Sequence, residues 1–127
     1  MSKTVKEIVE SVDAIRPNGF TPAQKTVWLN ELEGRVQTEV LLLARPEVIA
    51  YDWEEDKEKR VLAEPPYDNI YELYLSARID FANGEYRKYE NTMEAFNAAM
   101  GAFIRWFAGR YRPADGYRRE NAWTAAG

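Results

Sequence analysis

Neither cysteine nor histidine occurs among the 127 residues of this chain. The first absence excludes disulfide bonds and thiolate chemistry, and the second removes the commonest general base and the commonest transition-metal ligand. The sequence also contains no phosphate-binding loop, no glycine-rich dinucleotide motif and no metalloprotease motif. We therefore expect a protein that is not an enzyme, with no catalytic residue, no cofactor and no bound metal.

Long hydrophobic runs are missing as well. The longest nearly apolar stretch, residues 40–44, is far too short to span a bilayer, and residues 1–7 lack the apolar core of a secretory signal. Apolar residues nevertheless make up 46% of the chain and aromatic residues 13%, which argues for a folded protein. We expect a soluble, cytoplasmic chain with one hydrophobic core and no membrane contact.

Two helices are predicted in the first third of the chain. The first begins at Thr4, which forms a capping box with Glu7, and ends at the Arg-Pro-Asn-Gly turn of residues 16–19. The second begins at Thr21, is followed by proline at the first helical position, and runs to Pro46. Gly34 lies inside this second helix at a cost of roughly 1 kcal/mol relative to alanine, and we interpret it as room for a close neighbour.

A helical hairpin is predicted in the second half. The third helix begins near Asp68 and ends at Asn83 and Gly84, which favour a left-handed cap. The fourth begins at once, near Glu85, and continues to about Tyr111, which gives a length on the order of 40 Å at 1.5 Å per residue. The fourth helix is therefore longer than the first or third can cover. The apolar face expected for the third helix is Ile70, Leu73, Tyr74, Ala77 and Phe81, flanked by Tyr71 and Leu75.

Seven large apolar side chains share one face of the predicted fourth helix. Their spacing alternates between three and four, which is typical of a buried helical face or of a seam with a neighbouring helix or subunit. They are Tyr86, Tyr89, Met93, Phe96, Met100, Phe103 and Phe107. Ile104 and Trp106 lie off this face, and large apolar groups on a second face indicate an interface.

Residues 45–66 break the helical pattern. Residues 48–53 and 60–63 have the composition of two short strands, so a small β-hairpin and a long loop are equal alternatives. Between them lies a carboxylate cluster with interleaved lysines, which predicts a solvated loop and leaves a metal or partner site as the alternative. The cluster consists of Asp52, Glu54, Glu55, Asp56 and Glu58.

The fold class predicted from these elements is mainly α. We expect an antiparallel four-helix bundle in residues 1–112, with the 45–66 loop or hairpin between helices two and three, and an extended tail in residues 113–127. The end of the chain is rich in arginine and aromatic residues but has no periodicity. It has the chemistry to bind nucleic acid or a protein groove, and a solvated segment without a partner is the third alternative.

Two segments resemble a known family. Residues 15–40, IRPNGFTPAQKTVWLNELEGRVQTEV, and residues 65–103, PPYDNIYELYLSARIDFANGEYRKYENTMEAFNAAMGAF, resemble small proteins of tailed bacteriophages and prophages that are called head–tail connector, adaptor or head-completion proteins. The resemblance lies in the order of these segments, covers about residues 4–107 and includes no catalytic motif.

The resemblance implies a structural protein of the virion neck, made in the host cytoplasm. It implies that copies of the chain form a ring, expected to hold twelve, which docks on the portal after DNA packaging and meets the next neck or tail-completion protein. DNA would pass through the ring without sequence-specific binding. The alternative to this function is that of a small helical nucleic-acid-binding or regulatory protein. The expected portal contacts are Arg110, Arg112, Tyr117, Arg118, Arg119 and Trp123. The expected contacts with the channel or the next protein are Trp53, Glu54, Glu55 and Asp56.

Overall fold

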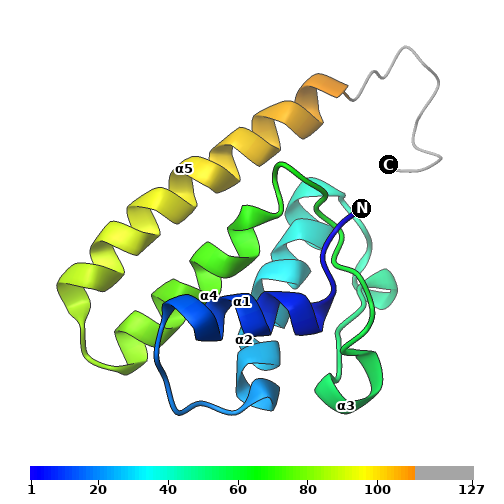
Figure 1. Cartoon of the computed structure of the whole chain (residues 1–127). Helices are drawn as coiled ribbons and strands as arrows, with labels where there is room; N and C mark the ends of the chain where they lie inside the picture. Colours follow the sequence, from blue (N-terminus) through cyan, green and yellow to red (C-terminus); the bar gives the residue numbers. More distant parts are fainter. Residues whose placement is uncertain (111–127) are drawn as a thin grey trace.

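Four long helices carry the fold in the computed structural model, which describes residues 1–110 (Figure 1). They are α1 (Val5–Ile15), α2 (Pro22–Arg35), α4 (Asn69–Ala82) and α5 (Tyr86–Arg110). The shorter elements are a π-helical turn (Val36–Val40), a 3-10 turn (Arg45–Glu47) and α3 (Trp53–Asp56). Residues 1–110 contain no β-strand beyond one isolated bridge between Thr4 and Arg60. The prediction of a mainly α fold is confirmed.

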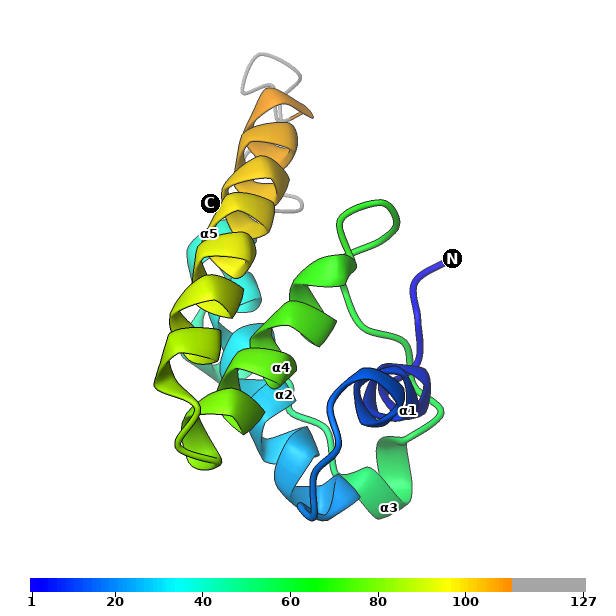
Figure 2. The ribbon, with the colours of Figure 1, turned by 60° about the vertical axis from the view of Figure 1, so that its left-hand side comes forward.

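The helices pack around α4. In Figures 1 and 2, α4 and α5 lie side by side and antiparallel, while α1 crosses the bundle. Both views also show that the last turns of α5 extend past the beginning of α4, as its greater length predicts. The end of α5 therefore leaves part of its surface uncovered by α4.

The predicted helix boundaries agree with the structure where local capping determines them. The Thr4 hydroxyl accepts a hydrogen bond from the Glu7 amide at 3.0 Å, and the Glu7 carboxylate accepts one from the Thr4 amide at 2.9 Å. Thr21 likewise accepts a hydrogen bond from an amide in the first turn of α2. Gly84 has a φ of +76°, a conformation that favours glycine, and α5 begins two residues later.

The second helix is shorter than predicted. It passes into a π-helical turn in which the Leu41 amide donates to the Val36 carbonyl at 2.9 Å, and Leu42 then adopts a φ of +61°. This left-handed residue redirects the chain before Pro46, so proline is not what ends the helix. Our interpretation of Gly34 is also wrong for residues 1–110, because a Cβ atom added there would meet no atom of a packing neighbour in this part of the chain within 4 Å.

The core confirms part of the stripe on α5. Phe96, Met100 and Phe103 are buried, whereas Tyr86, at the first turn, is 58% exposed. These side chains pack against buried residues from α1, α2 and α4. The main contributors are Val5, Ile8, Val12, Leu29, Leu32, Ile70, Tyr71, Leu75 and Ile79.

The predicted apolar face of α4 is partly wrong. Phe81 is 52% exposed, whereas the two flanking residues Tyr71 and Leu75 are fully buried, as is Ile79, which the predicted face did not include. Helix α4 touches α1, α2 and α5, so it buries several faces, and a single apolar stripe does not describe it. Phe81 instead packs at the edge of the bundle against Tyr86, with ring centroids 5.4 Å apart.

Residues 45–66 form a loop that contains α3, and the alternative of a β-hairpin is not adopted. The amides of Val5 and Lys6 donate to the carbonyls of Lys59 and Lys57, each at 2.9 Å. The Val61 amide donates to the Lys3 carbonyl, also at 2.9 Å. The loop therefore satisfies first-turn amides of α1, which have no partner within their own helix. The second predicted strand pairs with the N-terminal segment and not with the first.

Candidate partner-binding site

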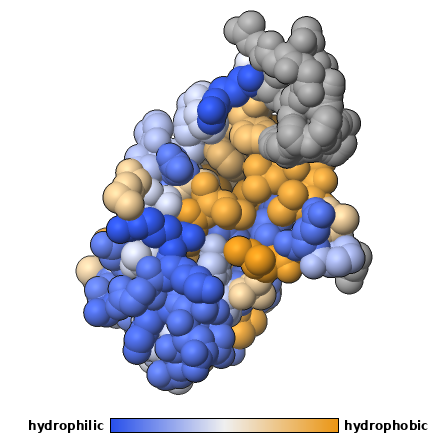
Figure 3. Space-filling view, turned by 90° about the vertical axis from the view of Figure 1, so that its right-hand side faces the viewer, coloured by the Kyte–Doolittle hydropathy of each residue, from blue (hydrophilic) through white to orange (hydrophobic). Residues whose placement is uncertain are grey.

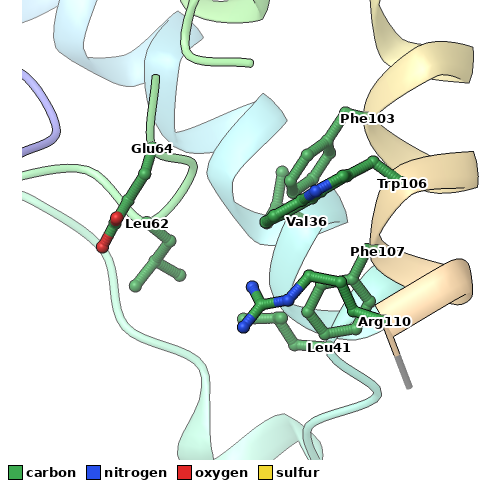
Figure 4. A pocket seen from close by; sticks show the side chains of 8 residues that line it. All are labelled: Val36, Leu41, Leu62, Glu64, Phe103, Trp106, Phe107 and Arg110. Carbon is green, nitrogen blue, oxygen red and sulfur yellow. The ribbon is translucent and has the colours of Figure 1, made fainter. Parts of the chain in front are cut away.

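An apolar pocket lies beside the end of α5. We call it the α5 pocket; it has a volume of about 290 Å³. In Figure 4, Phe103, Trp106, Phe107 and Arg110 approach it from α5, while Leu62 and Glu64 come from the loop opposite. The complete lining is Val36, Leu41, Leu62, Glu64, Phe103, Trp106, Phe107 and Arg110. The pocket thus joins the predicted helix stripe to a loop wall that sequence patterns did not reveal.

Ring contacts order the α5 side of this pocket. Trp106 stacks on Tyr67, with ring centroids 4.9 Å apart and an interplanar angle of 28°. The guanidinium of Arg110 lies 4.7 Å from the centroid of the Trp106 ring, which is the geometry of a cation–π contact. The prediction that Trp106 lies on a second apolar face fits this position. Arg110 is the one predicted portal contact within residues 1–110, and it is held against an aromatic ring.

The pocket opens on an apolar area of the surface. Leu62 is 38% exposed and Trp106 is 37% exposed, although both are large apolar side chains. Figure 3 shows apolar side chains gathered on the face beside the end of α5. A contiguous apolar area of this kind marks a site of interaction more often than isolated exposed residues do.

The predicted acidic contact segment forms α3. Trp53 packs partly against the core, and the ammonium of Lys57 lies 5.6 Å from the centroid of its ring. Glu54 and Glu55 are exposed on the first turn of this short helix. Of the predicted residues in α3, these two therefore have the carboxylates best placed to meet another molecule.

Two other carboxylates of the segment hold its own turn. Asp52 accepts a hydrogen bond from the Glu55 amide at 3.1 Å, and Asp56 accepts one from the Asp52 amide at 2.8 Å. The hydrogen bond from Asp52 is the main reason that the pKa of Asp56 lies below its usual value, and Lys59 lowers it further. Among residues 1–110, no group of three or more carboxylates is placed to hold a metal ion.

The two candidate surfaces lie apart. In Figures 1 and 2, α3 is at one end of the molecule and the last turn of α5 is at the other. The remaining predicted portal contacts lie outside the residues that the structure describes. They are Arg112, Tyr117, Arg118, Arg119 and Trp123.

A buried glutamate positions the loop wall of the α5 pocket. Glu33 is fully buried and accepts hydrogen bonds from the hydroxyls of Tyr51 at 2.7 Å and Tyr71 at 2.6 Å. It also accepts one from the amide of Leu62 at 3.0 Å. Sequence patterns did not single out Glu33; its place between Leu29, Leu32 and Val36 on the apolar face of α2 is the signal that could have found it.

Burial governs the titration of this cluster. Desolvation raises the pKa of Glu33 above its ordinary value of 4.5, and the three donated hydrogen bonds offset part of that rise. Burial and the nearby carboxylate raise the pKa values of Tyr51 and Tyr71, so both hydroxyls keep their protons and remain donors. In the described part of the chain, no cation is among the hydrogen-bond partners of Glu33, so its side chain is stabilised by neutral donors, the two tyrosine hydroxyls and the Leu62 amide.

A second buried carboxylate ties three helices together. Asp80 on α4 is fully buried and accepts hydrogen bonds from Arg16 at 3.0 and 3.4 Å. Thr92 on α5 donates to the same carboxylate at 2.9 Å. Arg16 follows the last residue of α1, so this cluster fixes the end of α1 against the hairpin of α4 and α5.

No protein-family model, no curated protein and no solved structure matches this chain. Within residues 1–110, none of the helices combines the length and the apolar character that crossing a bilayer requires.

Proposed function

We propose that this chain is a non-enzymatic structural protein of the neck of a tailed bacteriophage. It acts as a head–tail connector that docks on the portal as a ring, with twelve copies implied by the family resemblance, and links the portal to the next neck or tail protein. DNA passes through the ring without sequence-specific contacts, and the protein resides in the virion.

The observation that carries this proposal is the separation of two chemically different surfaces. The α5 pocket presents aromatic side chains and Arg110 at one end, and α3 presents Glu54 and Glu55 at the other. A connector has to hold two different partners at once, which requires separate surfaces. Arg, Tyr and Trp are the residues that most often anchor protein interfaces, and they are concentrated at the α5 end.

The ion pairs favour a protein partner over nucleic acid. Eight basic side chains within residues 1–110 lie within 4.0 Å of a carboxylate, among them Arg16, Lys25 and Arg78. Their charge is therefore compensated locally, and the whole chain carries a net charge of −4. A nucleic-acid-binding protein relies instead on uncompensated arginines and lysines that contact phosphates.

Deletion of residues 113–127 tests the portal contact. We expect the shortened chain to keep its helical circular dichroism spectrum, because the buried core lies within residues 1–110, and to lose binding to the portal protein encoded in the same genome. Binding is measured by native mass spectrometry of the mixed proteins. Unchanged portal binding by the shortened chain would contradict the proposal.

DNA-binding measurements on the same samples distinguish the connector function from the alternative, a nucleic-acid-binding protein. A nucleic-acid-binding protein should retain a DNA fragment with an affinity that falls steeply as salt increases. The connector proposed here should show little affinity for DNA at any salt concentration and strong affinity for the portal. DNA binding without portal binding would favour the alternative of a nucleic-acid-binding protein.

A further inference from the structure

We propose that the α5 pocket is the docking site of the chain's own C-terminal segment, residues 111–127, in the free protein. The ring of Trp123 enters the pocket, and Arg118 or Arg119 approaches the carboxylate of Glu64 on the loop wall. The inference concerns the isolated subunit and does not depend on whether the chain binds a portal.

The size and lining of the pocket fit a side chain. Its volume of about 290 Å³ is at the lower limit of the roughly 300–1,000 Å³ that small-molecule sites occupy. Its walls are mainly aromatic and aliphatic, with Phe103 and Trp106 on one side and Leu62 on the other (Figure 4). An aromatic ring with one polar edge is the group that such a pocket binds best, since it buries much apolar area at a low cost in conformational entropy.

The position of the pocket favours the adjoining segment as its occupant. Arg110 lines the pocket and is the last residue of α5 that the structure describes, so the proposed occupant is joined directly to a residue of the pocket lining. Trp123 is 13 residues beyond Arg110. A fully extended chain of that length reaches about 40 Å, so Trp123 can return to the pocket. Pro113 and Gly116 lie between them, and these residue types favour a reversal of chain direction.

Charge complementarity points to the same segment. Glu64 is exposed at the rim, and within residues 1–110 its carboxylate has no basic side chain within 4.0 Å. Arg118 and Arg119 lie a few residues before Trp123 in the sequence. A docked tryptophan would therefore bring a guanidinium close to the carboxylate, and arginine binds carboxylates with two parallel hydrogen bonds.

Tethering decides between the chain's own segment and that of a second copy. A covalently linked segment reaches a nearby site at an effective concentration in the millimolar range, on the order of 1 mM for a short flexible linker. Free copies at micromolar concentration compete poorly with it. The docked segment is consequently withheld from other molecules until a partner with several contacts displaces it.

Engineered cysteine pairs test this arrangement in the full-length chain, because the natural sequence has no cysteine. The test variant carries Leu62→Cys and Ala122→Cys, so Trp123 is retained. The control carries Ile104→Cys and Ala122→Cys. Ile104 is 44% exposed, similar to Leu62 at 38%; it is not part of the pocket lining and lies closer in the sequence to the segment. Disulfide formation under a mild oxidant is followed by non-reducing electrophoresis and mass spectrometry at low micromolar protein.

The proposal predicts an intramolecular disulfide in the test pair that forms at least about fivefold faster than in the control pair. Adding Trp123→Ala should slow the test pair to the rate of the control and leave the control unchanged. Equal rates in the two pairs, or a test pair unaffected by Trp123→Ala, would overturn it. Predominantly intermolecular disulfides in the test pair would also overturn it, because they assign the pocket to a second copy.

Discussion

The carboxylate of Glu33 lies 2.6 Å from the hydroxyl of Tyr71, in the interior between α2 and α4. The same carboxylate accepts the amide of Leu62, whose side chain lines the α5 pocket. One buried side chain therefore links the helical core to the wall of the candidate partner-binding site. Loss of this link should affect both stability and the shape of the pocket.

Replacement of Glu33 by alanine should destabilise the protein strongly. The Tyr71 hydroxyl and the Leu62 amide would lose their acceptor inside the core, and each uncompensated donor costs about 1–3 kcal/mol. The Tyr51 hydroxyl would keep only its 3.3 Å hydrogen bond to the carbonyl of Arg60. We expect a total loss of about 3–5 kcal/mol in the free energy of unfolding, measured by urea denaturation. Glu31→Ala is the control on the same helix, because Glu31 contacts Tyr74 and Arg78 at the surface and should cost less than about 1 kcal/mol. Equal losses in the two variants would contradict this role.

The stability that Glu33 contributes should depend on pH. Burial raises its pKa in the folded protein above the ordinary value of 4.5, so the folded state binds this proton more tightly than the unfolded state. The contribution is therefore complete below about pH 4.5 and is lost as the pH rises through the folded pKa. The difference in unfolding free energy between the natural chain and Glu33→Gln, which does not titrate, should fall as the pH rises above about 4.5. A difference that grows with pH would show that the pKa is lowered instead.

Gly34→Ala should stabilise the protein. Gly34 lies within α2, and an added Cβ would meet no packing neighbour among residues 1–110 within 4 Å, so alanine gains helix propensity without a clash. We expect about 0.5–1 kcal/mol of additional stability in thermal or urea unfolding. Gly84→Ala is the matched opposite, because the φ of +76° at Gly84 should make alanine unfavourable by about 1–2 kcal/mol. A loss of stability in Gly34→Ala would contradict the open surroundings of this position.

Reversing the charge of α3 should impair assembly without unfolding the subunit. Glu54→Lys and Glu55→Lys together change two exposed carboxylates and leave Asp52 and Asp56, which hold the turn, in place. We expect a lower yield of infectious particles, because an acidic surface meets either a basic neighbour or the passing DNA.

The matched control for this variant carries Glu90→Lys and Glu94→Lys, two exposed carboxylates on α5. It makes the same change in net charge away from α3. Normal particle yield with the α3 variant would count against a role of this segment, and equal impairment by both variants would point to net charge alone.

Local chemistry made the helices of this protein predictable. The effects of Thr4, Thr21 and Gly84 are local. The two threonines cap amides three residues further on, Gly84 adopts a left-handed conformation, and each residue lies at a helix boundary in the structure. The end of the second helix was not predictable in the same way. It depends on a π-helical turn and on the left-handed conformation of Leu42, a residue type that carries no signal for either.

The candidate site was predictable only in part. Its helical side follows from the α5 stripe and from Trp106, which are regular features of the sequence. Its loop side depends on where Glu33 and the amides of α1 hold residues 57–63, and those hydrogen bonds join residues far apart in the chain. The choice between hairpin and loop likewise depended on α1. Its first-turn amides donate to the carbonyls of Lys57 and Lys59, which a second strand would have paired with in a hairpin.

The position of the chain in an assembled particle tests the proposed function most directly. The measurement is an electron cryomicroscopy reconstruction of the neck of virions that encode this protein. The proposal predicts a ring of helical subunits that match residues 1–110, placed directly against the portal, with the ends of their α5 helices facing it. A fully resolved neck in which no density matches this fold, although the protein is produced during infection, would contradict the proposal.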